Sequence, residues 1–226
     1  MLLARRLPFA IAAALVAAAP SAVSVAIAGP VTGTVRVQVR DGTTAAPAIV
    51  YAEPLDAAAP RKPGTFTLQQ KGKTFVPRLL AVPVGSTVTF PNDDQIFHNV
   101  FSRTTPGPFD LGLYRAGASK SRTFDQPAAY RVFCNIHPQM TALLAVVATP
   151  FATIADATGA FTLELPPGRY KLTALSERAA PVSQELTVGP GAVSAPALTL
   201  DESQFVQVPH KNKFGQDYPK DAWTKH

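Results

Sequence analysis

Cysteine is almost absent from this 226-residue chain, which contains Cys134 and no other. One cysteine cannot form a disulfide within the chain, and it cannot supply the C-x-x-C-H motif that attaches a c-type haem. Histidine is also scarce, with four residues, and no Ser/His/Asp arrangement for nucleophilic catalysis can be assembled from them. These absences argue against an enzyme and direct attention to what the few reactive side chains could bind.

Helical patterning is almost absent as well. Few segments place hydrophobic residues at a helical period, and no run after the first thirty residues is long enough to span a membrane. The chain has instead 22 prolines and 14 glycines, with short segments rich in Val, Thr and Phe between turn signals. This pattern predicts an all-β protein.

The scarce ligand residues are clustered. Cys134, His137 and Met140 lie within seven residues, and His98 lies 36 positions before the cysteine. Thiolate and thioether sulfur favour Cu(I) and imidazole keeps Cu(II) acceptable, so this donor set is typical of a blue-copper electron-transfer site. Zinc has little use for a thioether and fits less well. The sequence therefore predicts one copper ion held by these four residues.

Each ligand residue also has an ordinary explanation. A lone cysteine in an exported chain can be a free thiol or half of an intermolecular disulfide, and a lone methionine usually fills a core. Once the first segment is set aside, however, Met140 is the only methionine, and it lies six positions from the only cysteine. This coincidence, with His137 between the two sulfurs, favours the metal site.

The segments around these ligands are similar to those of a known family. They are Phe75-Val76-Pro77, Val82 to Asn92, His98-Asn99-Val100 and Tyr130 to Cys134. Together with the short C-x-x-H-x-x-M loop, they make residues 66–148 resemble a cupredoxin, and the loop is similar to that of amicyanin. Related sequences also occur among methylamine utilization proteins. The resemblance implies a Greek-key β-sandwich, and we place this copper domain at residues 62–148.

By this resemblance, Cys134 is the strong ligand, His98 and His137 complete the trigonal plane, and Met140 is the long axial ligand that tunes the potential. Asn99 directly follows the first histidine. The resemblance implies that it ties the two ligand loops together by hydrogen bonds and so supports a preformed site.

The resemblance also implies an apolar surface patch where electrons leave through the edge of the His137 ring. Phe97, Ile136 and Pro138 are the candidates for this patch. The predicted function is single-electron transfer between redox partners, with no catalytic residues. A copper carrier or sensor would use the same ligands, and the single methionine of the mature chain argues against it.

A second sandwich is expected to surround the copper domain in sequence. After residue 148, two alternating strands are separated by an Asp/Gly turn at 156–159 and followed by a Pro-Pro-Gly turn at 166–168. This pattern is similar to the carboxypeptidase-regulatory-like or transthyretin-like sandwich, a carbohydrate-binding-like fold. Its opening strands are missing there and appear near the N-terminus. We therefore expect residues 29–61 and 149–200 to form one discontinuous sandwich; the alternative is that 29–61 form an extra layer on the copper domain.

The first 28 residues resemble a secretory signal peptide. Arg5-Arg6 begin the segment, an apolar run extends from Leu7 to Ala19, and Ala26-Ile27-Ala28 is a small-residue cleavage site. We expect cleavage near Ala28 and a soluble mature protein in the periplasm. An uncleaved membrane anchor is the alternative, but the run is Ala-rich and short for one.

Residues 201–226 are expected to form an irregular C-terminal tail, because prolines, a glycine and many polar residues interrupt it. His210 and His226 lie in this tail, far from any cysteine, and are expected at the surface. The candidate anchors of the tail on a domain surface are Phe205, Phe214, Tyr218 and Trp223.

Charge is unevenly distributed. Residues 62–148 contain nine Lys and Arg against four Asp and Glu, a net charge of +5, whereas the rest of the mature chain contains ten against eleven. This contrast predicts an acidic redox partner steered toward the copper domain. No nucleic-acid recognition motif accompanies the charge, and carbohydrate binding by the second sandwich would rest on fold analogy alone.

Overall fold

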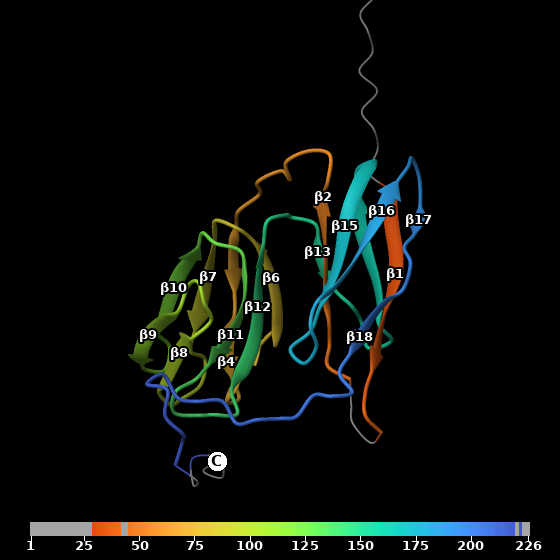
Figure 1. Ribbon diagram of the computed structural model, residues 1–226. Helices are drawn as coiled ribbons and strands as arrows, with labels where there is room; N and C mark the ends of the chain where they lie inside the picture. The colour runs from red at the N-terminus through yellow and green to blue at the C-terminus, as the bar shows by residue number, and fades with distance from the viewer. Residues whose placement is uncertain (1–28, 42–44, 220–221, 223–226) are drawn as a thin grey trace, which may run out of the picture.

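Two β-sandwiches packed side by side make up the computed structural model, which describes residues 29–41, 45–219 and 222 (Figure 1). The predicted signal peptide, Trp223 and His226 lie outside the described residues. The described part of the chain contains 18 strands and no α-helix, which confirms the predicted all-β class. No helix in these ranges is long and apolar enough to span a membrane.

The first sandwich is built between residues 65 and 147. One sheet has the order β10 (Ser119–Phe124), β7 (Ser86–Pro91), β3 (Thr65–Thr67); the other has the order β6 (Leu79–Pro83), β12 (Thr141–Val147), β11 (Ala128–Phe133), β8 (His98–Ser102), β9 (Phe109–Tyr114). A hairpin of β4 (Gln69–Lys71) and β5 (Thr74–Val76) completes it. Buried side chains from both sheets, including Val88 and Leu144, fill the space between them, and Cys134 and Met140 belong to this cluster.

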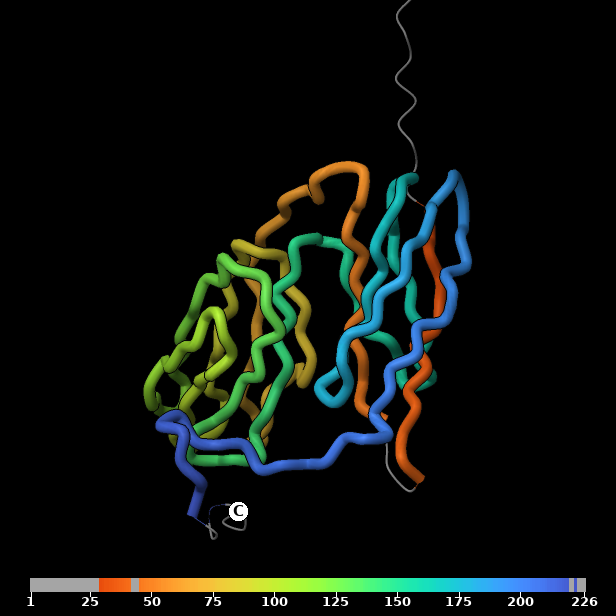
Figure 2. Tube along the Cα trace, viewed as in Figure 1, coloured from red at the N-terminus to blue at the C-terminus, as the bar shows by residue number. Residues whose placement is uncertain are grey.

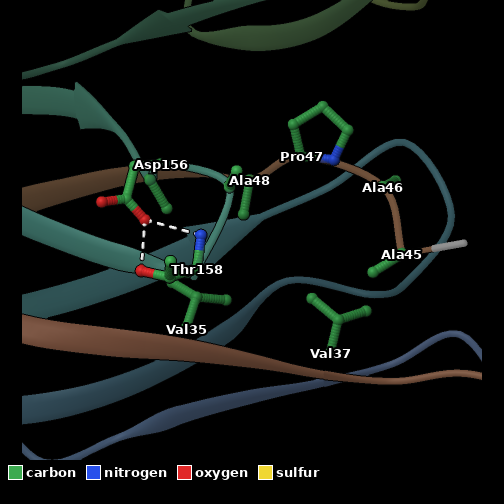
Figure 3. Close-up of a pocket in the computed structure, with 11 residues that line it drawn as sticks. Val35, Val37, Ala45, Ala46, Pro47, Ala48, Asp156 and Thr158 are labelled. Atoms are coloured by element: carbon green, nitrogen blue, oxygen red, sulfur yellow. Dashed lines mark hydrogen bonds between the residues drawn. The ribbon is translucent and has the colours of Figure 1, made fainter.

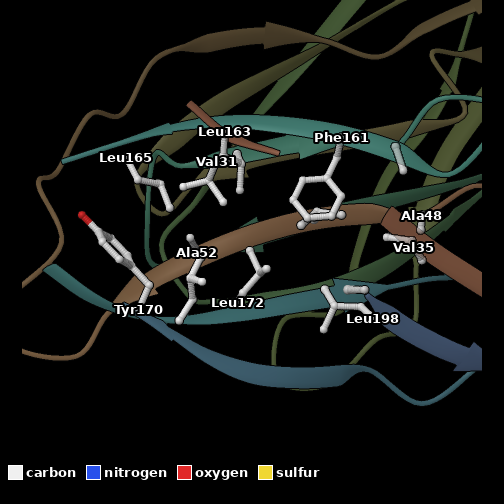
Figure 4. Packing of buried hydrophobic residues seen from close by; sticks show 14 of the residues in the cluster. Val31, Val35, Ala48, Ala52, Phe161, Leu163, Leu165, Tyr170, Leu172 and Leu198 are labelled. Carbon is white, nitrogen blue, oxygen red and sulfur yellow. The ribbon is translucent and has the colours of Figure 1, made fainter. Parts of the chain in front are cut away.

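The second sandwich uses both ends of the described chain. In one sheet, β1 (Gly29–Gln38) pairs with β14 (Ala160–Leu165), β17 (Val193–Ser194) and β18 (Leu198–Asp201); the other has the order β13 (Ala152–Ile154), β2 (Ile49–Pro54), β15 (Gly168–Leu175), β16 (Val182–Val188). Val31, Leu163 and Leu172 are among the buried residues between these sheets (Figure 4). Strands from residues 29–54 thus pair with strands from residues 152–201. That the two sandwiches fold as separate domains stays a prediction.

The chain passes between the sandwiches after β2, after β12 and again after β18 (Figure 2). A third buried cluster lies where the sandwiches meet, formed by Ile49, Leu79, Leu143, Ala145 and Val147. Side chains alternate along a strand, so β12 turns Leu143, Ala145 and Val147 toward the second sandwich and Ala142, Leu144 and Val146 toward the core of the first. Both faces of β12 are therefore covered, and this strand begins one residue after Met140.

A cavity of about 500 Å³ lies in the second sandwich beside the 156–159 turn (Figure 3). Val35, Val37 and a run of small residues at 45–48 line most of it. The Asp156 carboxylate is already engaged within the turn: its Oδ1 accepts hydrogen bonds from the Thr158 N–H at 2.8 Å and the Thr158 hydroxyl at 2.7 Å. These hydrogen bonds explain why the turn has an acidic residue at position 156. The lining of the cavity is mainly apolar, which gives no support to carbohydrate binding by the second sandwich.

We expect Leu143→Ala to lower the free energy of unfolding by about 2–5 kcal/mol, because Leu143 is 2% exposed and its truncation would leave a cavity between the sandwiches. Leu55→Ala is the matched control, since Leu55 is 40% exposed and should change stability by no more than about 0.5 kcal/mol. Urea denaturation followed by circular dichroism measures both. Equal effects would show that the contact between the sandwiches does not stabilise the protein.

Candidate metal centre

The predicted ligands converge at one end of the first sandwich. His98 begins β8, whereas Cys134, His137 and Met140 lie in the loop between β11 and β12. Cys134 Sγ lies 3.8 Å from His98 Nδ1 and 3.7 Å from His137 Nδ1. The two Nδ1 atoms are 3.1 Å apart. Among the described residues, these three side chains form a group whose ligand atoms could hold one metal ion.

Met140 lies at the end of the same loop. Its side chain is fully buried in the cluster that also contains Cys134. The Met140 N–H donates to the His137 carbonyl at 2.9 Å, and the Cys134 N–H donates to the Met140 carbonyl at 3.2 Å. These bonds close the loop into a tight turn that holds the cysteine and the methionine together. The role of Met140 as an axial ligand stays a prediction.

Asp94 fixes the orientation of the first histidine, with its Oδ2 2.8 Å from His98 Nε2. A carboxylate can only accept, so Nε2 carries the proton and Nδ1 keeps its lone pair toward Cys134. The turn between β4 and β5, where Gly72 and Lys73 have φ values of 63° and 55°, donates two N–H groups to Asp94 at 2.6 and 2.8 Å. Burial acts to raise the pKa of Asp94, but these hydrogen bonds and that of His98 outweigh burial and lower it.

Sequence reasoning missed this role of Asp94. In sequence, Asn92-Asp93-Asp94 is typical of a turn, and only the position of Asp94 four residues before His98 indicates more. A metal-binding histidine commonly donates its second N–H to a carboxylate, which raises its basicity and fixes its ring. Asp94 and His98 have this relation.

Cys134 is fully buried, and burial raises the pKa of its thiol in the metal-free protein. The backbone N–H groups of Asn99, Ile136 and His137 are directed at the sulfur and act in the opposite sense, by stabilising the thiolate. A bound metal cation would convert Cys134 fully to the thiolate, because a thiol that coordinates a metal ion is deprotonated. The donors at this point are a thiolate, two imidazoles and a neighbouring thioether, and this set fits copper.

Besides its backbone N–H, which is directed at the Cys134 sulfur, Asn99 links the two ligand loops through its side chain by an indirect route. Its side-chain Nδ2 donates to Asp110 Oδ1 of β9 at 2.7 Å. The other oxygen of Asp110 accepts from Lys213 Nζ at 2.7 Å, and the Lys213 N–H donates to Asn135 Oδ1 at 2.9 Å. The residue after His98 and the residue after Cys134 are therefore joined through a residue of the C-terminal tail.

The predicted surface patch is only partly as expected. Phe97 is 53% exposed and Ile136 is 42% exposed, and each directly precedes a ligand histidine in sequence. Pro138 is buried instead, because the tail lies over it and His210 Nε2 donates to its carbonyl at 2.6 Å. Leu113 is exposed and pairs with Asn99 across β8 and β9, and no sequence signal marks it as a neighbour of the site.

The tail differs from its predicted behaviour in two further residues. His210, expected at the surface, is partly buried and stacks on Phe133 with ring centroids 3.9 Å apart. Phe214, a candidate anchor, is 72% exposed. Tyr218 does anchor the tail, since its hydroxyl donates to the Cys134 carbonyl at 3.2 Å.

No protein-family model matches the chain, and no curated protein matches it. Solved structures match in part. A copper-containing nitrite reductase (NirK) from Thermus scotoductus SA-01 is 30% identical with a TM-score of 0.36, over 42% of this chain and 25% of that one. A purple cupredoxin from Nitrosopumilus maritimus is 30% identical with a TM-score of 0.31, over 34% of this chain and 84% of that one.

A Cu(I) form of an amicyanin variant is 22% identical with a TM-score of 0.35, over 37% of this chain and 82% of that one. The chain thus spans a quarter of the length of the nitrite reductase it matches. At TM-scores this low, the interpretation of the site rests on its own residues and their geometry.

We expect Asp94→Asn to weaken copper binding by about 10- to 100-fold, because His98 would lose the carboxylate that fixes its ring and raises its basicity. Asp93→Asn is the matched control, since the neighbouring Asp93 accepts from Gln69 and not from His98. Competition against a chelator of known affinity measures both variants. Equal affinities in the two variants would show that Asp94 does not act through His98.

Proposed function

We propose that this protein is a type 1 (blue) copper protein that carries single electrons between redox partners. The observation that carries the proposal is the convergence of Cys134 Sγ with the Nδ1 atoms of His98 and His137 in one largely buried group, with Met140 beside Cys134 in the core. Copper held there would supply a one-electron couple, because the donor set suits both Cu(I) and Cu(II).

Hydrogen bonds from groups outside the ligand set hold the predicted ligands in place. Asp94 orients His98, and backbone hydrogen bonds close the loop from Cys134 to Met140. Donors held in this way have little freedom to follow the different geometric preferences of the two oxidation states. A small structural change per electron favours fast transfer.

Burial favours an electron shuttle over a copper carrier. His98, Cys134 and Met140 are all fully buried, so a competing ligand cannot reach their donor atoms without opening the fold. His137 is partly exposed and is flanked in sequence by the exposed Ile136. Electrons can leave through this ring edge, whereas an ion cannot leave without breaking the buried contacts.

The remaining elements of the proposal are the compartment and the partner. The resemblance of residues 1–28 to a signal peptide supports export to the periplasm. The net charge of +5 on residues 62–148 supports an acidic redox protein as partner. We assign no catalytic role, because a copper ion held by all four predicted donors would have no open position for a substrate. We assign the second sandwich a supporting role.

The experiment that tests this function uses the mature protein loaded with one equivalent of Cu(II). We expect a reversible one-electron couple and rapid electron exchange with an acidic redox protein, slowing as salt shortens the screening length to about 8 Å. We also expect the reduced protein to keep its copper against a Cu(I) chelator. Ready loss of Cu(I) together with a salt-independent rate would assign the protein to the carriers instead. Cys134→Ser, which removes the thiolate and keeps the volume similar, is expected to abolish the reversible couple.

We expect Met140→Leu to retain copper but to shift the reduction potential upward, because removing a weak axial sulfur donor favours Cu(I). The control is Leu144→Met on β12, a core exchange of similar volume that leaves the ligand set intact. Protein-film voltammetry measures both potentials. An unchanged potential in Met140→Leu would show that Met140 is only a core residue.

A further inference from the structure

The C-terminal tail lies across the loop that carries three of the predicted ligands. After β18 the chain leaves the second sandwich and crosses to the first, where residues 209–219 lie against the loop between β11 and β12 (Figure 1). We call residues 209–219 the strap. Its first contact is His210, which stacks on Phe133 with 22° between the ring planes and donates to the Pro138 carbonyl. The strap thus touches the residue before Cys134 and the residue after His137.

The second contact reaches the cysteine itself. The Tyr218 hydroxyl donates to the Cys134 carbonyl at 3.2 Å, and its ring packs edge-on against His210 with centroids 5.2 Å apart. His210 and Tyr218 therefore support one another, while each donates to a different carbonyl of the ligand loop.

The third contact joins both ligand loops. Lys213 donates its backbone N–H to Asn135 and pairs its ammonium with Asp110, which also accepts from Asn99. The ion pair is partly exposed and would contribute little alone. Here, however, it belongs to a chain of hydrogen bonds that connects the neighbours of His98 and Cys134. In such a network the effect of one bond depends on the others.

The strap has internal order of its own. The Asn212 side chain accepts from the N–H groups of Phe214 and Gln216 at 2.9 and 3.0 Å, and the Asn212 N–H donates to the Gln216 carbonyl at 2.8 Å. Gly215 has a φ of 82°, which a residue with a side chain rarely adopts. This turn directs Lys213 and Tyr218 back to the ligand loop from one compact segment.

We propose that the strap is a positioning element of the metal centre: through Lys213 and Tyr218 it fixes the loop from Cys134 to Met140 in the geometry that the metal requires. It covers Pro138 and leaves Ile136 exposed, so it also limits access to the loop to the side of Ile136. The positioning of the loop by the strap is a property of the folded chain and does not depend on the function proposed above. The effect on reduction potential rests on the function proposed above.

The test compares full-length variants. Lys213→Met removes the ammonium and keeps the length of the side chain, and Tyr218→Phe removes only the hydroxyl; the double variant removes both contacts. Lys211→Met is the matched control, because Lys211 lies in the same strap but pairs with Asp217 of the strap itself. Hydrogen–deuterium exchange of the metal-free proteins reports how often the 134–140 loop opens.

We expect amides of residues 134–140 to exchange about tenfold faster in the double variant than in the wild type, and unchanged in the control. After loading with Cu(II), the double variant should also differ from the control in reduction potential. Identical exchange in the double and control variants would overturn the proposal. A wild-type protein without a blue centre would refute the proposed function, and the exchange measurement on the metal-free proteins would still decide whether the strap holds the loop.

Discussion

The antiparallel pairing of β8 with β11 is the constraint on which the metal centre depends. His98 and Cys134 are 36 residues apart, and neither can form a site without the other. Because the strands run in opposite directions, with Phe101 opposite Phe133, the start of β8 extends past the end of β11 toward the ligand loop. The two ligand segments therefore meet at one edge of the sheet, and the loop to β12 needs only a few residues to add His137 and Met140.

The rest of the molecule holds this edge in place from three directions. The turn between β4 and β5 fixes Asp94, which orients His98. The strand that follows Met140 is covered on both faces, by the core of the first sandwich and by the cluster between the sandwiches. The strap holds the outer side of the ligand loop. The second sandwich thus supports the site by covering one face of β12, although its own residues lie outside the ligand group.

The sequence is most informative where few residues carry the chemistry. One cysteine, one later methionine and four histidines leave little choice of ligands, and alternating hydrophobic residues identify strands because their period is two. Asp94 could not be assigned, because its role depends on which turn lies beside it in space. The contacts of His210 and Lys213 could not be predicted either, since an irregular segment has no period and its partners lie more than 70 residues away. The burial of Pro138 follows from the same contacts.

The central claim is that Cys134 binds copper as a thiolate alongside two imidazoles. The most direct measurement is the visible absorption spectrum of the purified mature protein after addition of one equivalent of Cu(II). The structure predicts an intense thiolate-to-copper charge-transfer band, because the buried Cys134 Sγ lies next to an Nδ1 nitrogen of both imidazoles. Stoichiometric binding of copper without that band would place the ion away from the sulfur and contradict the account.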